Sequence, residues 1–439
     1  MSKRRALPQE PRTATIERLT HDGRGLGYVD GKAVFVQGAL PGETVRFKYT
    51  DIRRTYALGE VLECLTRSPE RTSPPCPHFG TCGGCALQHL NPKAQLRFKH
   101  ELLLEQLRRI GKVEPSEIWP PLTGPVLGYR RKARLGVRWV EKKGRTFVGF
   151  RERGSGRIAE LEACLTLHPK IGERIKDLAG LIDRLSLRDR IPQVEVAIGD
   201  NRSALVFRVL GPPCAEDRVR LEEFGSRFGF DVYLQPQGPD SLLTLTPPDP
   251  PWLCYRLPEA ITLWFGPLEF TQVNAEINQR LIEQVLAVLD PNPDETVLDL
   301  FCGVGNFTLP LARRAFRVVG VEGNPQAVLR ARENACLNQI ANVEFHCADL
   351  SQDLAAFPWA LARYDKLLLD PPRSGALPIM DYIPRWEPKR VVYVSCNPAT
   401  LARDVGHLVR SHEYRLVGAG ILDMFPHTAH VESMVLLQR

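Results

Sequence analysis

The strongest constraint on the fold is an alternation in the second half of the chain. Five apolar runs of strand length follow one another there: TVLDLF, RVVGVEG, VEFHCADL, YDKLLLDPP and RVVYVSCNP. Helical stretches such as NPQAVLRARENACLNQ lie between them. Strands that alternate with helices predict βαβ units and a parallel sheet, with a ligand site at the carboxyl ends of the strands.

The length of the chain predicts more than one domain. At 439 residues it exceeds one ordinary hydrophobic core. The start, MSKRRALPQE, is basic but lacks the apolar segment of a secretory signal, and no apolar run reaches the length of a membrane span. We therefore expect a cytoplasmic protein without a membrane partner. In that compartment, eleven cysteines favour metal binding or catalysis over disulfides.

Changes in pattern along the chain predict four parts of a multi-domain α/β protein. Residues 1–12 are expected to form a disordered basic tail. Residues 13–68 contain short apolar runs between the turn signals HDGRGLGYVDG and ALPG, which predicts a small OB-like β-barrel. Residues 69–265 are expected to form a mainly β domain that includes a cysteine segment. Residues 266–439 hold the α/β pattern described above.

Charge is unevenly distributed between the two halves. Residues 1–170 hold 31 Lys and Arg against 17 Asp and Glu, whereas the remainder holds 27 against 34. This asymmetry favours a polyanion-binding front half joined to a catalytic back half, although solvated charge without a function is the alternative. Basic and aromatic residues of the barrel are candidate nucleic-acid contacts: Arg24, Tyr28, Phe35, Lys48, Arg53 and Arg54. Residues 130–157 mix eleven Lys and Arg with aromatic residues and form a second candidate surface.

Polar groups stand at the ends of four consecutive predicted strands. The first strand ends in DLFCGVGNF, whose glycines let the backbone approach a ligand closely. Glu322 ends the second strand, where a carboxylate can accept ribose hydroxyls, and Asp349 and Asp370 end the third and fourth. This order resembles the S-adenosylmethionine-dependent methyltransferase fold. A G-x-G with an acid is also found in dinucleotide enzymes, so another nucleotide remains the alternative.

The fifth strand delivers Cys396 within YVSCNPATL. The preceding DPP segment suits an amino-methyltransferase, but Arg373 follows it instead of an aromatic residue, and the combination with Cys396 indicates methylation of carbon. C5 of uracil is a poor nucleophile until a thiolate adds to C6, and a separate base must then remove the C5 proton. We expect the helix that begins after Cys396, together with Arg403, to lower the pKa of the thiol. The target base must also leave its stack to reach such a site.

The last segment, DMFPHTAHVE, supplies the candidate bases His427, His430 and Glu432. Together with DLFCGVGNF, DPPRSG and SCNPATLARD, it resembles the RNA uracil-5-methyltransferase family over essentially the whole chain. The resemblance implies that Cys396 is the nucleophile and Glu432 the general base, with the two histidines as supporting residues. It also implies contacts to S-adenosylmethionine from six residues: Gln272, Phe301, Asn306, Glu322, Asp349 and Asp370.

A cysteine cluster in the front half predicts a metal centre. Cys76, Cys82 and Cys85 have C-x5-C-x2-C spacing, and a fourth thiolate must come from elsewhere. Spacing alone fits zinc as well as an iron–sulfur cluster, because both accept four thiolates. The segment CGGCALQHL resembles the [4Fe-4S] segment of the ribosomal branch of the family, which implies Cys164 as the fourth ligand. A radical S-adenosylmethionine enzyme is the rival class, but it would need C-x3-C-x2-C spacing, and the spacing here is different.

The combination of parts indicates the substrate. The N-terminal barrel resembles a TRAM domain, and this barrel with a cluster and the catalytic domain resembles the branch that acts on 23S rRNA. A flipped uridine in a single-stranded or loop region is the expected target, and no obligate protein partner is indicated. The alternatives are action on tRNA or on another rRNA site, and a non-catalytic RNA-binding or assembly factor. The presence of both Cys396 and Glu432 argues against the last of these.

Overall fold

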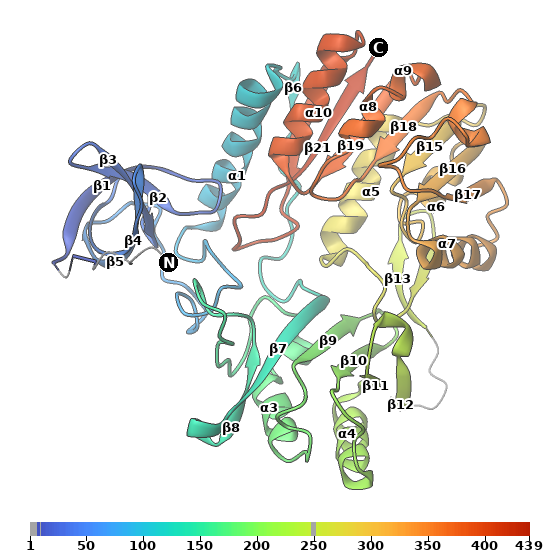
Figure 1. Cartoon of the computed structure of the whole chain (residues 1–439). Helices are drawn as coiled ribbons and strands as arrows, with labels where there is room; N and C mark the ends of the chain where they lie inside the picture. The colour runs from blue at the N-terminus through green and yellow to red at the C-terminus, as the bar shows by residue number, and fades with distance from the viewer. Residues whose placement is uncertain (1–6, 9, 247–251) are drawn as a thin grey trace. The chain divides into compact units, whose positions relative to one another are not determined.

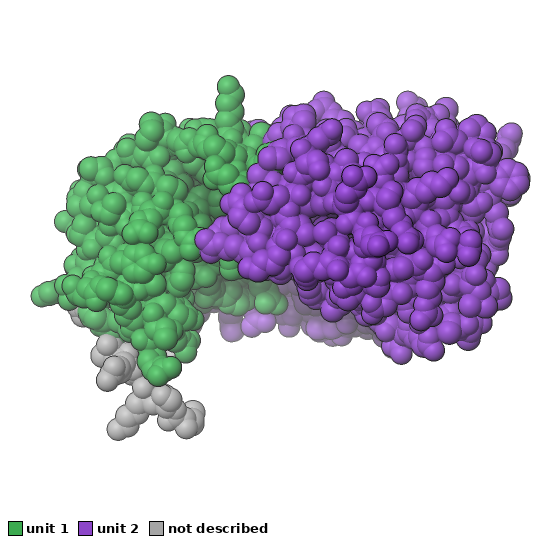
Figure 2. All heavy atoms as spheres, turned by 90° about the horizontal axis from the view of Figure 1, so that it is seen from above, with its two compact units in different colours: residues 1–102, 151–157, 425–430 green, residues 103–150, 158–424, 431–439 purple. Residues whose placement is uncertain are grey.

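The computed structural model describes residues 7–8, 10–246 and 252–439. The chain divides into two compact units (Figure 2), of which unit 1 holds residues 1–102, 151–157 and 425–430 and unit 2 holds the remainder. Much of the predicted tail, residues 1–6 and 9, lies outside the described residues, and the first strand already begins at Arg12. The four-part division of the chain stays a prediction.

Unit 1 contains a closed five-stranded barrel in the order β1-β2-β3-β5-β4, drawn in blue in Figure 1. Its strands are β1 Arg12–Leu19, β2 Gly25–Val29, β3 Lys32–Gln37, β4 Thr44–Ile52 and β5 Tyr56–Thr66. Alternate residues of β1, β3 and β4 are buried, as the period of two in a strand requires, and they fill the interior. At Gly59 a Cβ would collide with the ring of Phe47, so only glycine fits there. The predicted β-barrel is confirmed.

A helix follows the cysteine segment. It is α-helical over α1 Pro92–Gln106 and continues as a π-helical turn, Leu107–Gly111, which ends where Lys112 adopts a left-handed conformation. The KAQLRFKHELLLEQLRRIG pattern predicts one helix over 93–111. The helix in the structure covers nearly the same residues. Its last turn differs, because the backbone hydrogen bonds there follow the π-helical pattern instead of the α-helical one.

The middle of unit 2 is a six-stranded sheet in the order β12-β11-β10-β9-β7-β8. Its strands are β7 Lys132–Val140, β8 Arg145–Gly149, β9 Gln193–Ile198, β10 Ser203–Arg208, β11 Asp231–Gln235 and β12 Leu243–Thr246. The sequence predicts two pairs of strands, RKARLGVRWV with RTFVGFRERG and VEVAIGD with SALVFRVLG. In the structure both are antiparallel pairs, β7 with β8 and β9 with β10. Three helices accompany the sheet: α2 Pro169–Gly172, α3 Ile175–Asp183 and α4 Ala215–Phe228. The spacing of six apolar residues predicts one helical face, and the structure buries all six over α2, α3 and the residues just after α3: Ile171, Ile175, Leu178, Leu181, Ile182 and Leu185.

The carboxyl-terminal part of unit 2 is an eight-stranded sheet in the order β17-β16-β15-β18-β19-β21-β20-β6 (Figure 1). Its strands are β6 Glu117–Ile118, β15 Thr296–Leu300, β16 Arg317–Glu322, β17 Val343–Cys347, β18 Lys366–Leu369, β19 Arg390–Ser395, β20 Arg415–Leu422 and β21 Glu432–Gln438. Strands β15 to β19 pair in parallel, whereas β21 is antiparallel to both of its neighbours. A two-stranded hairpin, β13 Leu253–Leu257 with β14 Ile261–Phe265, precedes this part.

Six helices connect these strands: α5 Ala275–Leu289, α6 Thr308–Ala312, α7 Pro325–Leu337, α8 Leu377–Met380, α9 Ile383–Trp386 and α10 Pro398–Ser411. The central strands are buried on both faces, which is why their sequences are continuous apolar runs instead of alternating ones. The predicted α/β unit is confirmed. Because β15, β16, β18 and β19 are parallel, their carboxyl ends lie along one edge of the sheet, and the predicted site residues follow these ends.

Candidate active site

Strand register places Cys396 and Glu432 at neighbouring strand ends. Ser395, the last residue of β19, pairs with Ser433 of the antiparallel strand β21, and the Ser433 hydroxyl donates to the Ser395 carbonyl at 3.2 Å. Extending this register by one residue sets Cys396 opposite Glu432 at the end of the ladder. Side chains directly opposite each other in such a pair have Cβ atoms about 5 Å apart. The sheet therefore brings together two residues that are 36 positions apart in the sequence.

The turn that carries Cys396 is fixed by hydrogen bonds to the turn after β18. Asn397 caps α10, with its side-chain oxygen accepting from the Ala399 amide at 3.2 Å. The Asn397 side-chain amide and the Thr400 hydroxyl both donate to the carbonyl of Arg373, at 3.0 and 3.2 Å. The segments DPPRSG and SCNPAT are thus held to each other, and Cys396 lies in the second of these two anchored turns.

The surroundings of Cys396 raise the pKa of its thiol. Burial is the largest cause, the negative charge of Glu432 adds to it, and Arg373 opposes both. The expectation that the helix start and Arg403 lower this pKa is therefore wrong in its net direction. Arg403 pairs instead with the buried carboxylate of Asp404, at 2.7 Å, and donates to a loop carbonyl. The cation that acts on the thiol is Arg373, which the sequence pattern did not assign to that role.

Glu432 is buried, and burial raises the pKa of its carboxyl to about 8. The nearby Asp370 carboxyl raises this pKa further, whereas Arg373 lowers it. Burial also raises the pKa of Asp370 itself, to about 7. The charges of Asp370, Arg373 and Glu432 all act on the thiol of Cys396. Groups whose pKa values are moved towards neutrality are typical of sites that transfer protons.

The glycine loop after β15 has the backbone of a ligand-binding turn. Phe301 adopts a left-handed conformation with φ of 64°, which costs a non-glycine residue about 1 kcal/mol or more and is typical of functional sites. Gly303 and Gly305 also have positive φ, and a Cβ at Gly303 would meet no atom within 4 Å. The space in front of Gly303 is therefore open to a ligand.

Two predicted cofactor-binding side chains near this loop, Glu322 and Asn306, are held by hydrogen bonds. Glu322 accepts from the amides of Gly303, at 3.1 Å, and Asn324, at 2.8 Å, which turns its carboxylate toward the loop. The Asn306 side chain exchanges two 2.9 Å hydrogen bonds with Asn278 and accepts from the Tyr255 hydroxyl at 3.1 Å. Neither Asn278 nor Tyr255 belongs to a motif recognised in the sequence. Their role is to fix the orientation of Asn306.

The remaining predicted cofactor residues occupy the same sheet edge or its approaches. Asp349 is exposed, and hydrogen bonds from the hydroxyl and amide of Ser351 hold the pKa of its carboxyl below the usual value. Gln272 is half-buried, two residues before the Asn274 cap of α5. Contacts of all six predicted residues with a cofactor stay predictions.

The environment of Asp299 indicates what kind of ligand fits the carboxyl-terminal edge of the parallel strands. The Thr308 hydroxyl donates to its Oδ2 at 2.5 Å, whereas the buried Oδ1 has no hydrogen-bond partner among the described residues. Burial raises the pKa of this carboxyl to about 7, and Asp370 and Glu322 add to the effect. Acidic groups gathered at one edge, with an unused acceptor and an open glycine turn, suit a ligand that carries a positive charge and hydrogen-bond donors.

The three clustered cysteines lie in unit 1, in a loop held by backbone bonds. Phe79 bridges to Cys82, and the amide of Gly83 donates to the carbonyl of Arg151 at 2.9 Å. The amide of Gly84 donates to the Cys82 sulfur at 3.4 Å, a bond that favours a thiolate. Cys164 belongs to unit 2, and its participation stays a prediction.

The two candidate histidines belong to unit 1 as well. His427 accepts at its backbone carbonyl from the amides of Ala86 and Leu87, both at 2.9 Å, and its Nδ1 lies 3.2 Å from the side-chain amide of Gln95. His430 packs its ring against Phe425. These bonds tie residues 425–430 to the segment that follows Cys85. A supporting role of either histidine in catalysis stays a prediction.

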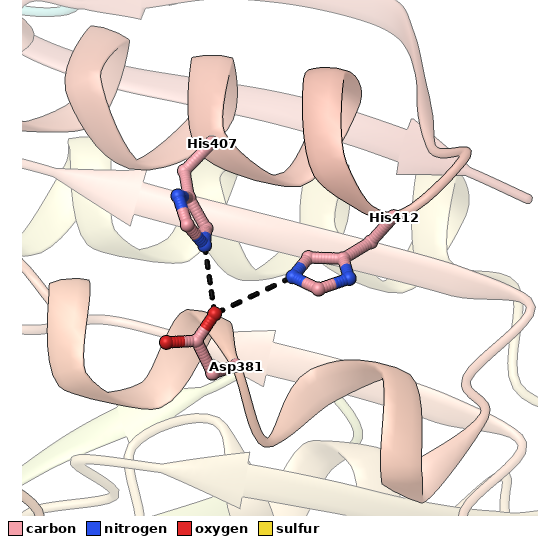
Figure 3. A group of neighbouring side chains, drawn as sticks. All are labelled: Asp381, His407 and His412. Carbon is pink, nitrogen blue, oxygen red and sulfur yellow. Dashed lines mark hydrogen bonds and ion pairs between the residues drawn. The ribbon is translucent and has the colours of Figure 1, made fainter.

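A further cluster, Asp381 with His407 and His412, was not recognised in the sequence (Figure 3). Asp381 follows α8, His407 lies on α10 and His412 caps its end. The Nε2 atoms of the two histidines lie 2.8 and 3.5 Å from one oxygen of Asp381, and these bonds hold the pKa of that carboxyl below its usual value, with His407 as the larger cause. The ion pairs fasten the α8–α9 connection to the end of α10.

Comparison with known proteins places the chain among RNA-modifying enzymes. The pattern of the family described as "tRNA (Uracil-5-)-methyltransferase" matches residues 265–439, and that of the TRAM domain matches residues 9–62. The 23S rRNA (uracil(1939)-C(5))-methyltransferase RlmD of Methylococcus capsulatus is 57% identical over 438 residues, which is 100% of this chain and 99% of that protein. RlmD of Alkalilimnicola ehrlichii is 52% identical and covers 100% and 98% of the two chains.

A solved structure supports the fold over nearly the whole chain. The tRNA (uracil-54, C5)-methyltransferase of Pyrococcus abyssi, in complex with S-adenosyl-L-homocysteine, superimposes with a TM-score of 0.74 at 25% identity. The match covers 97% of this chain and 100% of that one. None of the helices in the described parts of the chain is long and apolar enough to cross a lipid bilayer.

Proposed function

Since the chain belongs to the RNA uracil-5-methyltransferase family, we propose that it transfers a methyl group from S-adenosylmethionine to C5 of a uridine in 23S rRNA. Full-length identity to two RlmD proteins supports the ribosomal substrate, and the TRAM domain supports RNA binding. Action on tRNA is the second candidate, favoured by the family description and by the likeness to the archaeal tRNA enzyme.

The observation that carries the mechanism is the β19–β21 register, whose last pair, Ser395 with Ser433, directly adjoins Cys396 and Glu432, together with the effect of the Glu432 charge on the Cys396 thiol. The Cys396 thiolate adds to C6 of the uracil, so that electron density gathers at C5. S-adenosylmethionine, when bound, supplies an electrophilic methyl group for C5. The Glu432 carboxylate then accepts the C5 proton, and the C6–sulfur bond breaks to regenerate the thiolate and the C5–C6 double bond. The proton lost from C5 ends on Glu432 and passes to water.

Arg373 has two effects in this mechanism. Its positive charge favours the thiolate of Cys396 and the carboxylate of Glu432, both of which burial disfavours. Both groups must be deprotonated to act, and both have raised pKa values. The rate of methylation is therefore expected to rise with pH across the neutral range.

The uridine must reach Cys396 outside its stack, since the thiol approaches C6 from the face of the ring. A flipped uridine in a single-stranded or loop region is the proposed form of the substrate. The barrel carries cationic and aromatic side chains suited to such RNA, including Tyr28, half of whose surface is exposed, and Arg24, which stacks 5.5 Å from the ring centroid of Phe35.

A [4Fe-4S] cluster bound by Cys76, Cys82, Cys85 and Cys164 is part of the proposal. Two features of unit 1 fit such a group. A Cβ at Gly83 would lie 2.9 Å from a backbone carbonyl, so the chain there is wrapped too tightly for any residue but glycine. A buried histidine beside the loop, His89, also has both ring nitrogens without partners among the described residues. When bound, the cluster would supply iron and sulfide that order this loop.

The proposal is tested by trapping the covalent intermediate. Glu432→Gln, incubated with a 23S rRNA fragment and labelled S-adenosylmethionine, is expected to accumulate a protein–RNA adduct that carries the methyl group, because the C5 proton stays in place. The double variant with Cys396→Ala should form no adduct. Normal release of methylated RNA by Glu432→Gln excludes this residue as the base. Methylation of a tRNA transcript but not of the rRNA fragment would favour the second candidate.

A further inference from the structure

The side chain of His89 lies inside unit 1, where no described residue forms a hydrogen bond with its ring. Only 2% of its surface is exposed, and neither Nδ1 nor Nε2 has a partner among the residues that the structure describes. A neutral imidazole carries one N–H donor and one acceptor. Leaving a buried donor unpaired is unfavourable, so an orphaned ring of this kind indicates a partner outside the polypeptide.

The surroundings of His89 are those of the cysteine loop. Its ring packs on Phe79, with ring centroids 5.3 Å apart, and Phe79 forms a backbone bridge with Cys82. The preceding residue, Gln88, accepts a hydrogen bond at its side-chain oxygen from the backbone amide of Cys76, at 3.2 Å. The ring of His89 is therefore next to the loop that carries the first three predicted ligands.

Arg153 completes this environment. Its guanidinium donates to the carbonyl of Cys85, lies 5.2 Å from the ring centroid of Phe79, and is influenced by the charges of Cys85 and Cys82. Burial lowers the pKa of His89 to about 3, and the positive charges of Arg71 and Arg153 contribute. The imidazole is therefore neutral at physiological pH, with one ring N–H to donate.

Resting on the cluster proposed above, we propose that His89 donates its ring N–H to a sulfur atom of the bound cluster and acts as its positioning residue. Sulfur atoms of iron–sulfur clusters accept hydrogen bonds, and these bonds stabilise the reduced cluster and raise its reduction potential. Loss of such a partner in other metal sites costs about 10–100-fold in metal affinity. His89 thus sets how firmly the cluster is held and how easily it is reduced.

The test uses the full-length protein purified without oxygen. His89→Leu removes both nitrogens, whereas His89→Gln keeps an N–H donor. His100→Leu is the matched control, because His100 lies in the same unit and also has an orphaned ring nitrogen, and the charge that acts on it is that of Glu101. Iron and sulfide content, the midpoint potential and the rate at which the visible cluster absorbance is lost in air are measured for each.

The expected result for His89→Leu is a lower midpoint potential and loss of the cluster about 10-fold faster or more, with His89→Gln between it and the unchanged protein. His100→Leu should match the unchanged protein. Equal behaviour of His89→Leu and the unchanged protein overturns the proposal, as does an equal defect in the Leu and Gln variants, which would indicate packing alone.

A second measurement does not depend on whether His89→Leu folds. Protein that carries ring-15N-labelled histidine is reduced and studied by pulsed electron paramagnetic resonance. A nitrogen coupling to the cluster is expected, and it should disappear in His89→Gln. Persistence of this coupling in His89→Gln, or its absence from the unchanged protein, overturns the proposal. Absence of iron from the unchanged protein would instead contradict the cluster itself.

Discussion

Replacing Glu432 by Gln should stabilise the protein against unfolding, and the gain should grow as the pH rises. The carboxyl of Glu432 has a pKa of about 8 in the folded chain, against 4.5 for an ordinary glutamate. Burial is the main cause, and Asp370 adds to it. The folded state therefore holds this proton more tightly than the unfolded chain does.

The sign of the effect follows from proton linkage. Where the folded pKa is raised, the associated stability is fully present below the unfolded value and is lost as the pH rises through the folded value. The window for Glu432 thus runs from pH 4.5 to about 8. Within it, the unfolded chain ionises Glu432 freely, whereas the folded chain must ionise a buried carboxyl or retain its proton. A glutamine at this position does not titrate, so the variant does not lose free energy of unfolding in this way.

The magnitude can be worked from the two pKa values. One pKa unit is worth about 1.4 kcal/mol. Between 4.5 and about 8, the loss amounts to about 1 kcal/mol at pH 5 and about 4 kcal/mol at pH 7.5. The difference in the free energy of unfolding between Glu432→Gln and the unchanged protein should therefore grow by about 3 kcal/mol over this interval.

Denaturant unfolding at pH 5, 6, 7 and 7.5 measures this difference for unit 2, with the signal followed by near-ultraviolet circular dichroism. Glu283→Gln on the exposed face of α5 is the control, because it makes the same chemical change on the surface. Its effect should be small and independent of pH. A constant effect of Glu432→Gln across this range, or one that shrinks as the pH rises, would refute the assignment of a buried carboxyl with a raised pKa.

Three further predictions follow from the site. Cys396→Ala should abolish methyl transfer, measured with labelled S-adenosylmethionine, while calorimetric binding of that cofactor is retained; residual turnover contradicts the role of the thiol. Tyr255→Phe removes the 3.1 Å bond to Asn306 and should weaken cofactor binding about 5-fold, since a hydrogen bond contributes about 1 kcal/mol; unchanged affinity would show that the orientation of Asn306 does not matter. Purified protein should be brown and contain iron, and Cys164→Ser should lose most of it; one equivalent of zinc without iron overturns the cluster.

Local sequence patterns were sufficient to predict the elements of the fold. The apolar runs that end in Glu322 and Asp370 are strands because they are strand-length and buried on both faces, and the alternation with helices predicts the parallel sheet. The glycines of the first turn predict its left-handed backbone, although the positive φ of Phe301 carries no signal of its own in the sequence. Spacing also predicts that Cys82 and Cys85 are ligands of a metal centre, and this stays a prediction.

The electrostatics of the site were not predictable in the same way. Cys396 precedes a helix, which taken alone indicates a lowered pKa. The structure reverses the direction, because burial and the charge of Glu432 outweigh the effect of Arg373. These effects depend on which groups the sheet brings together and on how much water it excludes, and neither quantity is local in sequence.

The sequence by itself predicted the kinds of reacting group, since the chemistry of C5 methylation needs a thiol and a separate base; it supplied Cys396 as the thiol and three candidate bases, among which the family resemblance implies Glu432. The tertiary structure alone decided that these residues are neighbours, because the antiparallel pairing of β19 with β21 ends at Ser395 and Ser433, the residues next to Cys396 and Glu432. It also decided that Arg373, and not Arg403, is the cation beside the thiol. The physical reason is that strand pairing and burial act between segments distant in the chain, whereas sequence patterns report the preferences of neighbours.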